Sequence, residues 1–466
     1  LSPLSCIKNI QVALDLTVCR MRFQHFLIPR AALQRLILHL SGTPGRTYVS
    51  MASLGQYLDA AAHALSAKDG ATLALLFDVD SVHALGAVRS ALGDRGMNVG
   101  ELCERKVGAF APWDEIFASH CQCLGANAEG RHDDAFVSMQ ATIASFVKDF
   151  RAQDTAWSLD ALMNLVRGAV ALATRADDEA DRAGRSRMDS RLGDAGAALM
   201  LVYRNTANTS VWEKKSQCLF LVISLFKIYF KLNTLHLCKN LINAVNLPTF
   251  PAFDTFPIAQ RVTYAFYVGR LAVFDDNFSV AEQHLEYAFR HCKRDSSKNK
   301  TLILRYLLPV KLLMGKMPTA ALIGKYGLDE YADVVNAMKS GNVRMLNDAL
   351  KTHQISFIRQ GTFLVLEKLR NIVLRTLFQK VHAFSAEKNP AKGNQVNLHM
   401  FLAALKWCGC DMDIDEVEMI VANLIFKKFV KGYISHKSRV VVLAKTGAFP
   451  AISYDDDQPP ITHLQN

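Results

Sequence analysis

Residues 413–443 read DIDEVEMIVANLIFKKFVKGYISHKSRVVVL, a stretch that combines a helical pattern, a break and two short β-branched runs. Apolar residues recur every three or four positions over Asp413–Val430, which predicts an amphipathic helix with one buried face. Gly432 breaks that helix. Tyr433–Ser435 and Arg439–Leu443 then predict two strands joined by a short turn.

A second helix precedes this stretch. Val396–Cys408 carries apolar residues such as Phe401 and Leu405 on one face, and the turn Gly409-Cys410-Asp411 follows it. Helix, turn, helix and hairpin in this order predict a winged helix over residues 395–445.

The chain upstream of this module is predicted to be helical. Short amphipathic stretches recur there, separated by Gly, Pro, Asn or Asp, while strand signals are nearly absent. Residues 175–193, rich in Asp, Arg, Ser and Gly, predict a linker between an N-terminal helical region, 51–193, and a helical-repeat region, 194–384. Residues 454–466 contain three consecutive aspartates and two prolines, which predicts a disordered tail.

One helical hairpin, Tyr264–Cys292, has the spacing of a tetratricopeptide unit. Its turn falls at Asp276-Asn277-Phe278, and small or apolar residues occupy the four packing positions, Gly269, Ala281, Leu285 and Ala288. Because one repeat cannot bury its faces alone, neighbours are expected to stack on both sides. The predicted fold class is therefore an all-α, tetratricopeptide-like solenoid followed by a winged helix.

Positive charge is concentrated in the second half of the chain. The net charge is +11, and residues 201–450 hold 34 Lys+Arg against 18 Asp+Glu, so the remainder has an excess of acid. Such a field attracts phosphate backbones, anionic membrane surfaces or an acidic protein. The alternative is a basic, solvated surface without a partner.

Other functional classes lack their motifs. No Gly-x-x-x-x-Gly-Lys loop, Gly-x-Ser-x-Gly elbow or His-Glu-x-x-His pair occurs, so we predict neither an enzyme nor a cofactor. The two close cysteine pairs, Cys121/Cys123 and Cys408/Cys410, lack further ligands at zinc spacing, which predicts no metal and a reduced, intracellular setting. The most apolar run, Leu219–Phe230, is too short to span a membrane.

Helical repeats that run into a winged helix, with Lys431-Gly432-Tyr433-Ile434 leading into the wing, resemble a PCI domain. Within that group the chain resembles the PCI domain-containing protein 2 family. The resemblance covers roughly residues 51–449, and it is carried by KLNTL at 231–235 with NLI at 240–242, YVGRL at 267–271, LRYLLPVK at 304–311 and GKMP at 315–318.

The resemblance implies a nuclear role. Proteins of this family belong to transcription-and-export complex 2, which couples transcription to messenger-RNA export at the nuclear pore. A location in the nucleus and at the nuclear pore is therefore expected, with the cytoplasm left open. Two partners are also implied, a large GANP-like scaffold subunit and a small acidic subunit of the Sem/DSS type. An acidic partner agrees with the basic second half.

The winged helix supplies a candidate surface for RNA or DNA. Cations at its helix end and in its wing would hold phosphates, whereas the acidic start of the helix would repel them and so disfavours sequence-specific reading. We predict one basic surface from six residues, Lys427, Lys428, Lys431, His436, Lys437 and Arg439. The alternative is that these are only capping charges and solvated wing residues.

A second basic cluster follows the tetratricopeptide-like unit. It consists of Arg290, Lys293, Arg294, Lys298 and Lys300. Contact with RNA or an acidic partner is one interpretation, and a solvated loop is the favoured one.

Two functions from different classes follow from these observations. The first is a nucleic-acid-binding export adaptor. The second is a purely protein-binding scaffold of a signalosome- or proteasome-lid-like complex, whose winged helix packs against neighbouring subunits.

Residues 1–50 require a separate interpretation. They hold six Lys/Arg and one acid, Asp15, a composition typical of a transit peptide. Met51-Ala52-Ser53, however, reads as an ordinary initiator context. We interpret residues 1–50 as translated upstream sequence or a disordered leader, and leave them out of the fold prediction.

Overall fold

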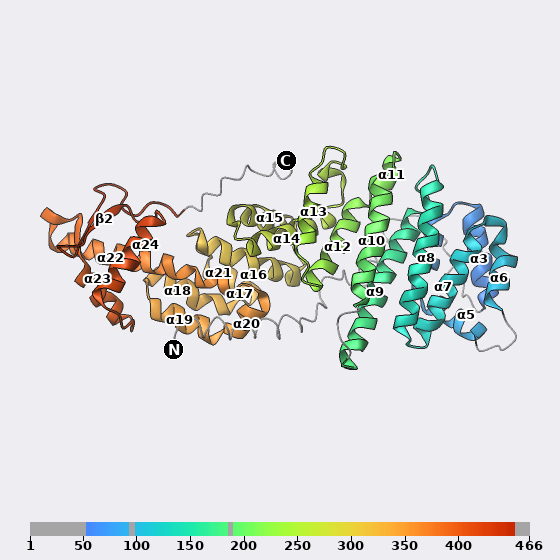
Figure 1. The fold of residues 1–466 in the computed structure, drawn as a ribbon, viewed down its shortest axis with the longest axis horizontal. Helices are drawn as coiled ribbons and strands as arrows, with labels where there is room; N and C mark the ends of the chain where they lie inside the picture. Colours follow the sequence, from blue (N-terminus) through green and yellow to red (C-terminus); the bar gives the residue numbers. More distant parts are fainter. Residues whose placement is uncertain (1–52, 93–97, 185–189, 453–466) are drawn as a thin grey trace. The chain divides into compact units, whose positions relative to one another are not determined.

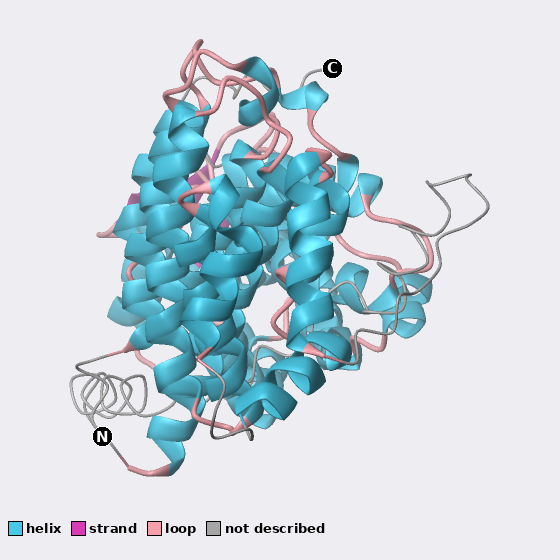
Figure 2. Ribbon diagram, turned by 90° about the vertical axis from the view of Figure 1, so that its right-hand side faces the viewer, coloured by secondary structure: helices cyan, strands magenta, loops and turns pink. Residues whose placement is uncertain are grey.

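The computed structural model describes residues 53–92, 98–184 and 190–452 (Figure 1). Helix predominates in these residues, and their strands form one small sheet (Figure 2). The chain divides into two compact units, an N-terminal unit that ends at Tyr264 and a C-terminal unit that begins at Ala265. The predicted leader, 1–50, and the predicted tail, 454–466, lie outside the described residues.

The N-terminal unit is built from helices around an aromatic core. The ring of Phe77 lies 5.0 Å from that of Phe117, and the ring of Trp113 lies 5.1 Å from that of Phe146. Its helices are α3 (Leu54–Ser66), α4 (Gly70–Leu76), α5 (Val82–Leu92), α6 (Val99–Val107), η2 (Gly108–Phe110), α7 (Trp113–Ala128), α8 (His132–Ala152), α9 (Leu159–Arg182), α10 (Arg191–Ala207), α11 (Trp212–Lys215), α12 (Cys218–Lys231), α13 (His236–Val245), η4 (Phe253–Thr255) and the start of α14 (Ile258–Phe274).

The linker predicted at residues 175–193 is wrong over its first part. Helix α9 continues to Arg182, and α10 begins at Arg191. The polar residues between Arg175 and Arg182, which indicated a loop, lie on α9, and some of them bind residues elsewhere in the chain. Asp177 accepts hydrogen bonds from the backbone amides of Arg191 at 2.7 Å and Leu192 at 3.2 Å, so a side chain of α9 caps the start of α10.

The C-terminal unit holds the remaining helices and the sheet. None of the helices that the structure describes in either unit is both long and apolar enough to cross a bilayer. The elements of the C-terminal unit after α14 are α15 (Phe278–His291), α16 (Ser297–Leu313), α17 (Ala320–Tyr326), η5 (Asp329–Tyr331), α18 (Ala332–Ser340), α19 (Val343–Thr352), α20 (Gln354–Gln360), α21 (Phe363–Glu367), α22 (Leu369–Lys388), η6 (Pro390–Lys392), β1 (Gln395–Asn397), α23 (Leu398–Trp407), α24 (Ile414–Phe426), β2 (Gly432–Ser435) and β3 (Val440–Leu443).

The predicted tetratricopeptide-like hairpin is formed by α14 and α15. Its turn lies where the sequence places it, and Asn277 caps α15 by accepting a hydrogen bond from the amide of Val280 at 3.1 Å. A Cβ atom on Gly269 would lie 2.7 Å from Cγ of Leu285, so the two helices approach closely at that glycine. The predicted fold class, helical repeats followed by a winged helix, is confirmed.

Replacing Gly269 with leucine is expected to lower the free energy of unfolding by about 1–3 kcal/mol, because the new side chain overpacks the contact with Leu285. The matched control is Gly324→Leu, since a Cβ at Gly324 of α17 meets nothing within 4 Å. Urea denaturation of both variants measures the difference. Equal midpoints for the two variants would contradict the close approach.

The winged helix contains one strand more than the sequence predicts. The sheet has the order β1-β3-β2 with antiparallel pairing throughout, and Val441 of β3 pairs with Val396 on one side and Ile434 on the other. The first helix was predicted to begin at Val396 but begins at Leu398. Val396 fits the apolar helix face by spacing, yet it is buried as the centre of β1 between two exposed neighbours.

The second helix of the module, α24, ends at Phe426 rather than at the predicted Val430. Lys428 adopts a left-handed φ of +59°, which ends the helix, and the amide of Phe429 donates to the carbonyl of Leu424 at 2.9 Å. Helix α24 contacts β2 and α23, so the end of the helix and the wing belong to one packed module.

Candidate nucleic-acid interface

Three of the six predicted cations lie where α24 ends. Lys427, Lys428 and Lys431 are exposed, whereas Phe429 and Val430 between them are buried and anchor the turn. Lysines at a helix C-terminus interact favourably with the partial negative charge of its last carbonyl groups. The end of α24 therefore carries three exposed positive charges on one short stretch of backbone.

A fourth lysine, Lys445, joins this stretch through the sheet. The amide of Ala444 donates to the carbonyl of Lys431 at 2.9 Å, and the amide of Lys431 donates to the carbonyl of Ala448 at 2.8 Å. Lys445 is exposed beside this ladder. We call Lys427, Lys428, Lys431 and Lys445 the lysine cluster, and no ion pair joins these four to another residue that the structure describes. No sequence pattern predicted Lys445 as a member of this cluster, because the backbone pairing after β3 brings it there.

The other predicted cations lie in the wing, against the acidic half of α24. Arg439 forms ion pairs with Asp415 at 2.6 Å and Glu418 at 2.5 Å, and the hydrogen bond that it donates to Asp415 raises the pKa of the Arg439 guanidinium. His436 Nδ1 lies 2.8 Å from Glu418. Because Glu418 lies eight residues before Phe426, the last residue of α24, the wing pairs and the lysine cluster are separated by about 12 Å along the helix.

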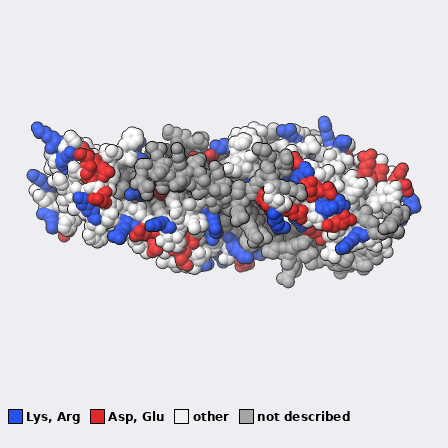
Figure 3. Space-filling view, turned by 60° about the horizontal axis from the view of Figure 1, so that its bottom comes forward, with Lys and Arg blue, Asp and Glu red and all other residues white. Residues whose placement is uncertain are grey.

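The six predicted residues therefore do not form one basic surface. His436 and Arg439 bind carboxylates of the same module, and only Lys437 in the wing is exposed without such a pair in the described residues. Figure 3 shows blue and red surface side by side at its left-hand end, where Figure 1 has α23, α24 and β2. The structure corrects the predicted grouping and leaves the lysine cluster as the candidate site.

The acidic start of α24 has a structural role. Asp413 accepts hydrogen bonds from the amides of Asp415 at 2.9 Å and Glu416 at 2.8 Å, while Glu416 accepts from the amide of Asp413 at 3.0 Å. This reciprocal capping box fixes the first turn of the helix. A carboxylate-rich start is unsuited to contact with base edges, so binding through this module would involve phosphates rather than sequence.

The second predicted cluster is divided in the same way. Lys300 is buried, and its Nζ donates to the carbonyl of Phe289 at 3.1 Å, so it stabilises the packing of α15 and α16. Arg290 forms an ion pair with Glu286. Lys293, Arg294 and Lys298 are exposed. The five residues are therefore not one free basic surface.

His, Cys, Asp and Glu side chains could hold a metal ion where three or more of them are grouped. Within residues 53–92, 98–184 and 190–452 no three His, Cys, Asp or Glu side chains are grouped to hold an ion. Of the predicted close cysteine pairs, Cys121, Cys123 and Cys408 are buried, and only Cys410 is partly accessible.

Comparison with known proteins finds relatives along most of the chain. The family model of the PCI domain matches residues 350–445. PCI domain-containing protein 2 of Xenopus laevis is 40% identical over 409 residues, which cover 86% of this chain and 98% of the frog protein. Its homologue in Drosophila melanogaster is 32% identical over 408 residues, covering 86% and 99%. Enhanced ethylene response protein 5 of Arabidopsis thaliana is 35% identical over 414 residues, covering 87% and 98%.

Proposed function

The chain belongs to the PCI domain-containing protein 2 family, and from this premise we propose that it is a non-enzymatic subunit of a nuclear complex that couples transcription to messenger-RNA export at the nuclear pore. Family membership supports a PCI scaffold subunit. The finer part of the proposal is that the subunit also binds RNA or DNA through its winged helix.

The observation that carries the nucleic-acid part is the lysine cluster. Four exposed lysines gather at the end of α24, and backbone hydrogen bonds hold that region in place. Contacts between lysine and phosphate release counterions, which gives binding that is salt-dependent and independent of sequence. The paired carboxylates of α24 lie at the other end of the helix and leave this end positive.

The proposed partners are a GANP-like scaffold subunit and a small acidic subunit of the Sem/DSS type. The excess of Lys+Arg over Asp+Glu in residues 201–450, 34 against 18, supports an acidic partner. In this proposal the acidic partner protein and the nucleic acid bind at separate sites, and the lysine cluster is the site for nucleic acid.

One observation favours the alternative, a purely protein-binding scaffold. Met419 and Phe426 are 71% and 85% exposed, and their spacing places them on the outward face of α24. Exposed apolar side chains on one helix face are typical of protein contacts. In that case the winged helix would pack against a neighbouring subunit of a signalosome- or lid-like complex.

Retention on immobilised single-stranded RNA tests the proposal against this alternative. The full chain is expected to bind at low salt and to elute steeply as salt rises. A protein that is not retained at low salt, but still assembles with its purified partners, would leave only the scaffold function.

Replacing Arg439 with glutamine is expected to leave RNA affinity within about twofold of the original protein, because its charge is already engaged by Asp415 and Glu418. The comparison variant is Lys428→Gln, which removes an exposed charge of the lysine cluster and is expected to weaken binding about fivefold at 0.1 M salt. Fluorescence anisotropy with a labelled oligouridine measures both. A larger loss for Arg439→Gln than for Lys428→Gln would contradict the assignment.

A further inference from the structure

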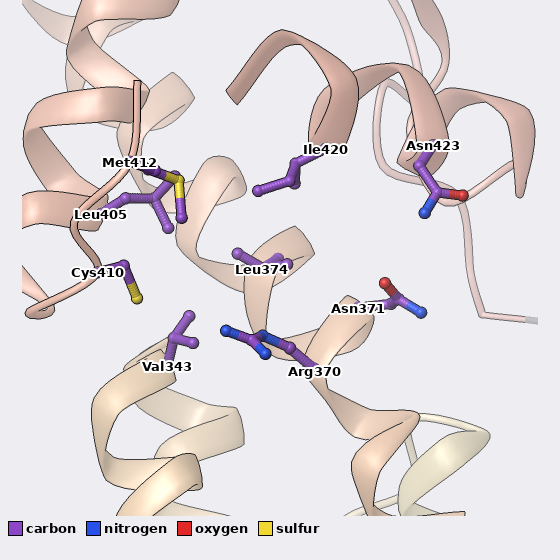
Figure 4. A pocket seen from close by; sticks show the side chains of 9 residues that line it. All are labelled: Val343, Arg370, Asn371, Leu374, Leu405, Cys410, Met412, Ile420 and Asn423. Atoms are coloured by element: carbon purple, nitrogen blue, oxygen red, sulfur yellow. The ribbon is translucent and has the colours of Figure 1, made fainter. Parts of the chain in front are cut away.

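A cleft lies between the repeat helices and the winged helix of the C-terminal unit (Figure 4). Its volume is about 230 Å³. Leu374 of α22, Leu405 of α23 and Ile420 of α24 are among the apolar side chains that line it. Three successive helices, α22 and the two helices of the winged helix, thus contribute to one apolar floor.

Polar side chains border this floor, and one of them, Arg370, is exposed and interacts electrostatically with Glu367. Arg370 and Asn371 reach it from α22 and Asn423 from α24, as Figure 4 shows. None of these three side chains makes a hydrogen bond or ion pair with another residue that the structure describes. A guanidinium group has five N–H donors and binds a carboxylate through two parallel hydrogen bonds.

The volume of the cleft and the chemistry of its lining indicate which class of ligand it can bind. Sites for small molecules and cofactors usually enclose about 300–1,000 Å³, so this cleft is small for such a ligand and suits one or two side chains. An apolar floor beside a guanidinium matches a carboxylate next to an aliphatic side chain. A nucleic-acid backbone offers the anion but no aliphatic group, so the cleft favours protein.

We propose that this cleft binds a short acidic segment of a partner protein. One carboxylate of the segment binds Arg370, and an adjacent leucine-sized side chain packs against Leu374, Leu405 and Ile420. The inference rests on the scaffold part of the proposed function and is independent of the lysine cluster.

Cys410 provides a direct measure of occupancy. It lines the cleft, and it is the one cysteine of the described residues that is not buried. The probe is a short acetylated and amidated peptide with one leucine between aspartates, added to the full chain. Alkylation of Cys410 by iodoacetamide is followed by mass mapping. When the peptide is present at ten times its Kd, the alkylation rate of Cys410 is expected to fall about tenfold.

Variants of Arg370 test whether its guanidinium is needed for the protection of Cys410 from alkylation. Arg370→Gln is expected to abolish it, and Arg370→Lys to restore it in part, because lysine keeps the charge but not the bidentate geometry. Arg359→Gln, an exposed arginine of α20 outside the cleft, is the matched control and is expected to keep full protection. Circular dichroism checks that the variants remain folded.

Several results would overturn the proposal. They are protection that survives in Arg370→Gln, absence of protection in the original chain, and equal protection by a peptide with serine in place of either the aspartates or the leucine. Equal protection by 3-methylbutanoate would make the cleft a small-acid site, and protection by oligouridine instead of the peptide would make it part of a nucleic-acid surface. RNA binding that is lost only in lysine-cluster variants, and kept in Arg370→Gln, separates this proposal from the nucleic-acid function.

Discussion

Reversing the charge of Lys427, Lys428, Lys431 and Lys445 to glutamate is expected to weaken binding of single-stranded RNA about a hundredfold at 0.1 M salt. Each phosphate contact on a single strand changes the slope of log K against log salt by about 0.7, which is a factor of about five in affinity at 0.1 M. Loss of about three contacts therefore multiplies three such factors, which gives the hundredfold loss of affinity. The same loss lowers the slope of log K against log salt by about two. Fluorescence anisotropy with oligouridine over a salt series measures both quantities.

The control for this variant reverses four other exposed lysines of the C-terminal unit, Lys325, Lys339, Lys351 and Lys388. Both variants change the net charge equally, so long-range attraction is weakened alike and only local contacts differ. If the control loses as much affinity as the cluster variant, the lysine cluster is not a binding site. If the cluster variant instead loses its protein partners, the scaffold function is the correct one.

Replacing Gly341 with alanine is expected to lower the free energy of unfolding by about 2–5 kcal/mol, from two costs that add. Gly341 ends α18 with a left-handed φ of +74°, which costs another residue about 1–2 kcal/mol. A Cβ atom there would lie 2.7 Å from the backbone nitrogen of Leu377 and 2.9 Å from its Cα, and overpacking costs about 1–3 kcal/mol. The backbone of α22 cannot yield as a flexible side chain does.

Gly327→Ala separates the two costs. Gly327 ends α17 in the same left-handed conformation, with φ at +58°, but a Cβ there meets nothing within 4 Å. This variant is expected to lose only the conformational part, about 1–2 kcal/mol. Urea denaturation of both variants gives the difference, and equal losses would mean that α22 does not press on Gly341.

Sequence patterns predicted the features that depend on neighbouring residues. The turn at Asn277 and the small residue at Gly269 belong to one hairpin, so their spacing alone places them correctly. Asp413 begins α24 for an equally local reason, since a capping box needs residues only three positions apart.

Features that depend on distant pairing were predicted less well. Val396 has the spacing of a helix face, but its partner Val441 lies in the last strand, and that pairing makes it a strand residue. The polar residues from Arg175 onward resemble a linker because partners such as Asp80, which forms an ion pair with Arg175, are far away in the sequence.

The candidate site shows the same division. The lysines at the end of α24 follow from the helix pattern, whereas neutralisation of Arg439 depends on Asp415 and Glu418 in another element. Arg370 received no functional prediction at all, because a cleft between α22 and the winged helix has no signature in either segment alone.

The pairing of β3 with both of its neighbours has a consequence for amide hydrogen exchange. β3 is the central strand, and the amide of Leu443 also donates to the carbonyl of Asn394 just before β1. Residues near the two ends of the winged helix are thus hydrogen-bonded to each other, and opening of β3 releases both ends at once. Protected amides of β1 and β2 should then exchange with solvent at one common rate, through a single opening event.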